Sequence, residues 1–128
     1  MALNPAAAIP IYMKADGTLG AADDYFKLTV PFDGVVVQVD ANLGTVGTTS
    51  GNTDFVVEDE TDGDLWTVAT GVGRLPYGTV TQTFYAASMD RTVVEAGQVL
   101  TLNVNAVDGG TTNGDLMVTL WVVPEQLM

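Results

Sequence analysis

The strongest candidate for chemistry is the acidic run Glu58–Asp64, which places five carboxylates in seven residues. Several oxygen ligands on a turn are what Ca²⁺ prefers, but the run lacks the EF-hand spacing of its glycine and its final glutamate. Asp62-Gly63 instead predicts a tight hairpin turn with solvent-facing side chains. The sequence favours a solvated acidic turn and leaves a weak divalent-cation site as the alternative, which Asp108 and Asp115 complete if the two loops share one end.

The chain lacks the residues that other common catalytic and metal-binding sites require. The chain has no His and no Cys, which excludes a histidine-based catalytic triad and zinc sites built from these two residue types. Its glycine-rich loops precede no helix-like segment, so we interpret them as turns and not as phosphate-binding loops. The four glutamates fall mostly at turns and ends, which disfavours a glycoside hydrolase; they are Glu58, Glu60, Glu95 and Glu125. We therefore expect no enzyme and no catalytic, cofactor-binding or metal-ligating residue.

Aromatic side chains offer a binding role instead. Sandwich proteins can present aromatic rings to a sugar, and the candidates for such a platform are Trp66, Tyr77, Tyr85 and Trp121. The competing interpretation, which we favour, places Trp66 and Trp121 in the core or at a subunit interface.

Period-two hydrophobic alternation, cut by glycine-centred turns, indicates the elements that must position these residues. The predicted strands are Tyr25–Val30, Val35–Asp40, Thr53–Glu58, Leu65–Thr70, Thr79–Ala86, Thr92–Glu95, Val99–Val107 and Leu116–Val123. The length of 128 residues suits one domain. We expect an all-β fold, a single eight-stranded antiparallel β-sandwich of jelly-roll type, with a short barrel as the alternative.

Residues 1–24 differ from this body, which occupies residues 25–128. Pro5 and Pro10 disfavour helix and predict an extended N-terminal arm. Its apolar side chains, Ile9, Ile11 and Tyr12, need a surface to cover them. The arm either packs on its own domain or contacts a partner.

The last predicted strand, Leu116–Val123, is apolar on both faces. Such a strand is either covered on both sides or part of an interface. The pattern leaves both possibilities open for this strand, which carries Met117, Trp121 and Val123 on one face.

The charge is strongly lopsided, with 16 acidic and 4 basic residues and a net charge of −12. This charge disfavours nucleic acid and anionic membranes as partners. It is consistent with solubility alone or with attraction to a basic partner. We see no secretory signal and no apolar run long enough to span a bilayer, so we expect synthesis in a cytoplasm without export by the general pathway.

Three segments carry a resemblance: Pro31–Val39 (PFDGVVVQV), Ala96–Val104 (AGQVLTLNV) and Gly114–Leu120 (GDLMVTL). Together with the Asp62-Gly63 hairpin, they make residues 25–123 resemble small virion proteins of tailed bacteriophages. The chain departs from that pattern at Gln98, where an acidic residue is usual, and in its N-terminal arm.

The resemblance implies a structural role on the exterior of a virion capsid. The expected function is to bind the assembled shell, as a homotrimer in contact with the major capsid protein, and to cement it. The resemblance further implies that Met117, Trp121 and Val123 form the oligomer interface and that the arm contacts a neighbouring subunit. The alternative is a carbohydrate- or receptor-binding module of a phage fibre or tail.

Overall fold

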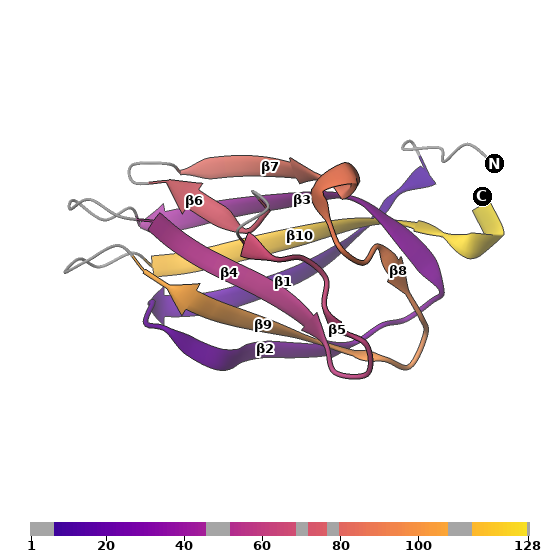
Figure 1. Ribbon diagram of the computed structural model, residues 1–128, viewed down its shortest axis with the longest axis horizontal. Helices are drawn as coiled ribbons and strands as arrows, with labels where there is room; N and C mark the ends of the chain where they lie inside the picture. Colours follow the sequence, from indigo (N-terminus) through magenta and orange to yellow (C-terminus); the bar gives the residue numbers. More distant parts are fainter. Residues whose placement is uncertain (1–6, 46–51, 69–71, 77–79, 108–113, 128) are drawn as a thin grey trace.

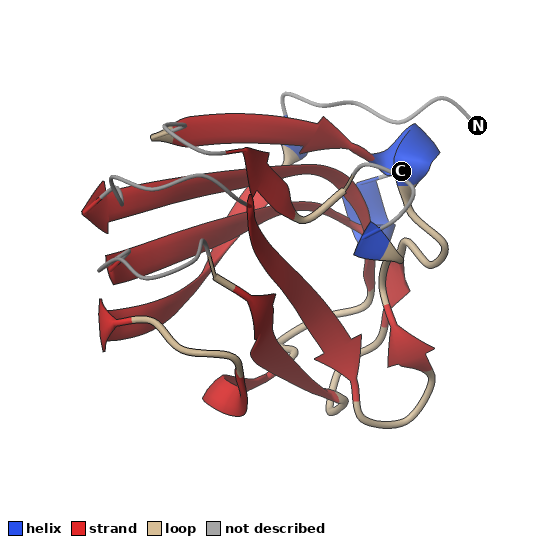
Figure 2. Cartoon of the chain, turned by 60° about the vertical axis from the view of Figure 1, so that its left-hand side comes forward, coloured by secondary structure: helices blue, strands red, loops and turns tan. Residues whose placement is uncertain are grey.

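The computed structural model describes residues 7–45, 52–68, 72–76, 80–107 and 114–127. Within these ranges the regular secondary structure is almost entirely β-strand, as predicted. The strands are β1 (Ile9–Thr18), β2 (Ala22–Thr29), β3 (Gly34–Thr45), β4 (Asn52–Asp59), β5 (Gly63–Asp64), β6 (Arg74–Pro76), β7 (Thr81–Tyr85), β8 (Val93–Val94), β9 (Val99–Ala106) and β10 (Gly114–Pro124). The short 3₁₀ turns include η3 (Ala86–Ser88) and η4 (Glu125–Leu127) and gather at one end (Figure 2).

The strands form two antiparallel sheets. The first has the order β1-β10-β3-β7, with β8 also pairing with β3, and the second has the order β2-β9-β4-β5, with β6 also pairing with β4. In Figure 1, β4 and β9 of the second sheet lie in front of β10 and β1 of the first. The buried hydrophobic core lies between the sheets, because alternate residues of each strand point inward.

The described residues contain ten strands and not the predicted eight. The predicted strand over Leu65–Thr70 is wrong for residues 65–68, which form no strand, while residues 69 and 70 lie outside the described ranges. Leu65 and Trp66 are both fully buried, and consecutive inward residues break the alternation of a strand. Across the Asp62-Gly63 turn, β4 pairs only with the two-residue β5. The segment expected to be a loop after Thr70 contains β6, which pairs with the start of β4.

The predicted N-terminal arm also differs from the structure. Residues 9–18 form the edge strand β1, paired with β10 from Ile9↔Val122 onward, and β2 begins at Ala22. No boundary therefore separates an arm from a domain at residue 24, and residues 1–6 lie outside the described ranges. Pro10 fits because an edge strand tolerates a missing ladder donor. Met13 and Ala15 are completely buried, which attaches β1 to the core.

One glycine is required by packing near the centre of the core. Gly73 has φ +82°, and a Cβ there would collide with the carbonyl oxygen of Phe55 and the ring of Trp66. The Trp66 Nε1 donates a hydrogen bond of 2.9 Å to that same Phe55 oxygen. The indole is thus fixed inside the sandwich, edge-on to the Phe55 ring at 5.7 Å between centroids.

Candidate functional site

The structure divides the predicted contact residues into buried and exposed groups. Ile11 is 8% exposed and Val123 is completely buried, so their assignment to partner contacts is wrong. Ile11 points inward from β1, in the same register as Met13. A β-bulge shifts the pairing with β3 between Trp121 and Val122, and both valines that follow are covered.

The other predicted residues, Tyr12, Met117 and Trp121, share the solvent side of the first sheet. We call this surface the outer face. The pairing of β1, β10, β3 and β7 arranges it in three rows: Pro10–Trp121–Gln38–Tyr85, then Tyr12–Thr119–Asp40–Thr83, then Lys14–Met117–Asn42–Thr81. Tyr12, which was predicted to contact a partner, therefore lies on the same surface as Met117 and Trp121, which were predicted to form the oligomer interface. Ile9 is 41% exposed at the end of β1, beyond these rows.

Asp40 lies at the centre of the outer face and is fully hydrogen-bonded. Its carboxylate accepts bonds from Trp121 Nε1 at 2.8 Å, from Gln38 Nε2 at 2.9 Å and from Thr83 Oγ1 at 2.9 Å. Partial desolvation is the largest single influence and raises the pKa of Asp40, but the three hydrogen bonds together lower the pKa below its ordinary value. The carboxylate fixes the Trp121 ring, and three neutral donors hold its negative charge in the middle of the face.

Large side chains around Asp40 remain open to solvent. Tyr12 is 59% exposed, Tyr85 is 63% exposed and Met117 is 45% exposed. Tyr12 and Met117 also line a small depression of about 130 Å³ with Phe26 from the second sheet. Apolar and aromatic groups collected on a flat sheet face are typical of a surface that another molecule covers.

The outer side of the second sheet has a different character. Lys27 Nζ lies 2.8 Å from Glu60 Oε1, and Arg74 contacts both carboxylate oxygens of Asp54 at 2.8 and 2.9 Å. The hydrogen bond between Lys27 and Glu60 is the main reason that the pKa of Lys27 is raised and that of Glu60 is lowered. These charged pairs are solvated, so we assign no docking role to this side of the sandwich.

The acidic run does not converge on a point. Glu60 faces Lys27, Asp62 accepts a hydrogen bond from Gln98 Nε2 at 3.0 Å, and Asp59 is buried beneath the turn. Across the described ranges, no three Asp, Glu, His or Cys side chains are placed to hold a metal ion. Asp108 lies outside these ranges, while Asp115 accepts a bond from the Gly17 N–H.

The predicted sugar platform is only partly assembled. Trp66 belongs to the core, as described above, and Tyr77 lies outside the described residues. Tyr85 and Trp121, however, flank Gln38 in one row of the outer face. The sequence interpretation missed the role of Asp40, although its outward position in the alternation of Val35–Asp40 was visible.

The described helices include none that has the length and apolar character needed to cross a bilayer. No protein-family model, curated protein or solved structure matches this chain.

Proposed function

We propose that this chain is a non-catalytic structural protein that binds the exterior of an assembled tailed-phage capsid, contacts the major capsid protein and stabilises the shell. It acts as a homotrimer whose subunits meet through the outer face. The observation that carries the proposal is the cluster of exposed Tyr12, Tyr85 and Met117 on one sheet. The resemblance of residues 25–123 to small virion proteins supports the capsid role, and jelly-roll-like connectivity belongs to the same proposal.

The proposed mechanism is linkage between binding and assembly. A protein that binds only the assembled shell stabilises that state by mass action. A trimer presents three copies of each contact, so weak individual contacts combine through avidity. Asp40 holds Trp121 and Gln38 in fixed positions, which reduces the entropy lost when the outer face is covered.

Light scattering across a dilution series tests the trimer. We expect three times the mass of one chain for the unmodified protein and a shift toward the monomer mass for Met117→Gln. Each buried apolar side chain is worth roughly 1.5–3 kcal/mol, so the dissociation constant rises by about tenfold or more. Thr29→Gln, an exposed position on β2 of the second sheet, is the matched control and leaves the mass unchanged. A monomer mass at every concentration of unmodified protein would contradict the proposal.

A carbohydrate-binding role is the second candidate, favoured by the row of Tyr85, Gln38 and Trp121. Two aromatic side chains flanking an amide can stack on a sugar ring and bond its hydroxyl groups. Tryptophan fluorescence separates the candidates, since Trp66 is buried and serves as a constant background. A spectral shift on glycan addition favours sugar binding, and a shift on dilution favours the subunit interface.

A further inference from the structure

A row of adjoining depressions crosses the end of the sandwich that carries β8 and η4. The largest has a volume of about 700 Å³ and includes Val35, Val93 and Glu125 in its lining. It shares Val93 and Glu95 with a neighbour of about 310 Å³ that reaches Asp59. On its other side it shares Asp33 and Glu125 with a depression beside Phe32. We call these three adjoining depressions the end groove.

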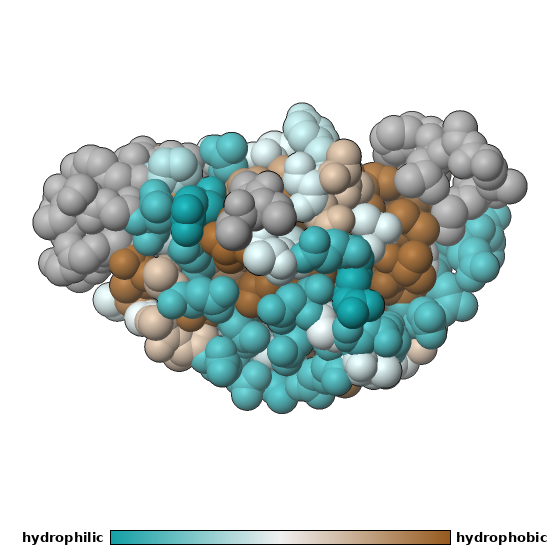
Figure 3. Space-filling view, in the orientation of Figure 1, coloured by the Kyte–Doolittle hydropathy of each residue, from teal (hydrophilic) through white to brown (hydrophobic). Residues whose placement is uncertain are grey.

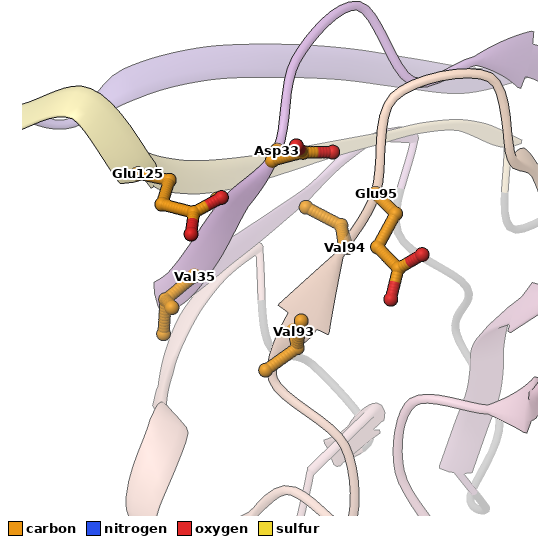
Figure 4. A pocket seen from close by; sticks show the side chains of 7 residues that line it. Asp33, Val35, Val93, Val94, Glu95 and Glu125 are labelled. Carbon is orange, nitrogen blue, oxygen red and sulfur yellow. The ribbon is translucent and has the colours of Figure 1, made fainter.

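The floor of the end groove is apolar. Figure 4 shows the side chains of Val35, Val93 and Val94 between the segments that carry Asp33, Glu95 and Glu125. Val93 is 59% exposed, although it lies in a strand paired with β3. Hydrophobic surface gathers over β8 and the start of β3 at the right of Figure 3, next to hydrophilic surface. The groove therefore combines an apolar floor with an acidic rim.

The charges of the rim are not neutralised within the described part of the chain. Asp33 accepts a bond from the Ala96 N–H at 2.8 Å, and Asp62 accepts one from the Gln98 amide, and both donors are neutral. No ion pair joins Asp33, Glu95 or Glu125 to any of the four basic residues, all of which are described. Arg91 is the single basic residue in the lining of the three depressions. The groove is complementary to a cation.

A second and independent observation points the same way. Asp59 is only 1% exposed and lines the groove at its inner end. Its Oδ1 accepts the N–H groups of Thr61 at 2.9 Å and Asp62 at 3.3 Å, but its Oδ2 is buried with no partner. A buried carboxylate oxygen without a donor is costly, so a ligand that brings a donor to this atom would gain from relieving that cost.

We propose that the end groove binds an extended, lysine- or arginine-bearing segment of a partner protein. A cationic side chain of that segment reaches Asp59 Oδ2, while its apolar side chains rest on Val35 and Val93. Charge-assisted hydrogen bonds to the carboxylate give the anchor, and the acidic rim excludes negatively charged partners. This inference does not rest on the proposed function, because the end groove and the outer face use different residues.

The test is an NMR titration of the full chain with the peptide acetyl-Lys-Val-Lys-Val-Lys-amide at low ionic strength. We expect saturable shifts at Asp33, Val93 and Glu95. Asp59→Asn keeps the Oδ1 acceptor of the turn and removes the charge, so it weakens binding by at least about tenfold. Asp64→Asn changes the same charge at an exposed site of the same hairpin outside the groove lining, and leaves binding unchanged.

Two further comparisons keep the outcome decisive if Asp59→Asn does not fold. The Glu95 side chain is exposed and makes no hydrogen bond with a described residue, so Glu95→Gln folds and weakens binding of the peptide. The same peptide with Gln in place of Lys does not bind. Equal binding of the neutral peptide, equal losses in Glu95→Gln and Asp64→Asn, or no saturable shifts in the groove would overturn the proposal.

Discussion

Asp40 shows how a single charge can organise an apolar surface. The residues that bond it come from three strands, β3, β7 and β10, so the carboxylate links the middle of the first sheet across its solvent side. Such a network is cooperative, because each donor orients the acceptor for the others. The consequence for the candidate site is a rigid Trp121 ring.

Trp121→Phe tests this network, since it keeps the ring packing and removes the Nε1 donor. We expect the free energy of unfolding to fall by roughly 1 kcal/mol near neutral pH, a modest value because solvent reaches the carboxylate. The pKa of Asp40 rises toward its ordinary value in the variant. Urea unfolding monitored by circular dichroism measures the loss, and an NMR pH titration of Asp40 measures the pKa.

The stabilising effect of the Asp40 carboxylate depends on pH in a definite direction. Because folding lowers the pKa of Asp40, its carboxylate stabilises the native state above its ordinary pKa of 3.8 and loses that effect as the pH falls through the lower folded value. The difference in the free energy of unfolding between Trp121→Phe and the unmodified protein therefore becomes smaller in acid. A difference that stays constant from about pH 7 to about pH 3 would show that lost packing, and not the hydrogen bond, is responsible.

At the scale of elements, β1 converts a proline-bearing N-terminal segment into part of the core. Its backbone pairs with the edge of β10, its inward side chains enter the core, and its outward Tyr12 and Lys14 reach the outer face. Removing residues 1–13 would expose β10 along half of that pairing. We therefore expect this truncation to unfold the protein or make it aggregate, the outcome expected for an exposed sheet edge and not for the loss of a free arm.

Paired substitutions test the orientation of β1. Met13 is completely buried, so Met13→Ala leaves a cavity and lowers the free energy of unfolding by about 2–5 kcal/mol. Lys14 is the adjacent exposed residue and has a surface ion pair of 3.2 Å with Asp16, so Lys14→Ala changes stability by less than about 0.5 kcal/mol. Thermal or urea unfolding of both variants is the measurement. Similar losses at the two positions would contradict an alternating strand here.

Some strands of this fold can be predicted from the sequence, and others cannot. β9 was predictable because its alternation of apolar and polar residues is local and strong, and β10 because it is a short, almost continuous apolar run. β6 was not, since three residues cannot show a period and its pairing with β4 is reinforced by the Arg74–Asp54 ion pair. The candidate site depends on register: Trp121 and Asp40 are 81 residues apart in sequence, and only the β10–β3 pairing brings them together. Spacing along a chain does not encode such a contact.

At the scale of the whole molecule, acidity and apolar surface are distributed unevenly. The net charge of −12 keeps most of the surface repulsive toward other copies of the chain. Within the three rows of the outer face Asp40 is the single acidic side chain and is held by neutral hydrogen-bond donors, whereas the end groove concentrates carboxylates that form no ion pair. The molecule thus has one surface suited to an apolar neighbour and another suited to a basic one.

Ionic strength separates these two surfaces in a single experiment. Raising the salt from about 0.05 to about 0.5 M shortens the screening length severalfold, so binding of the lysine peptide in the end groove weakens. Association through the outer face depends on apolar burial and on relief of charge repulsion between copies, so it persists or strengthens. Met117→Gln removes only the salt-resistant association, and Glu95→Gln removes only the salt-sensitive binding. If either variant impaired both, the two surfaces would be one functional unit, and self-association would have to use the groove.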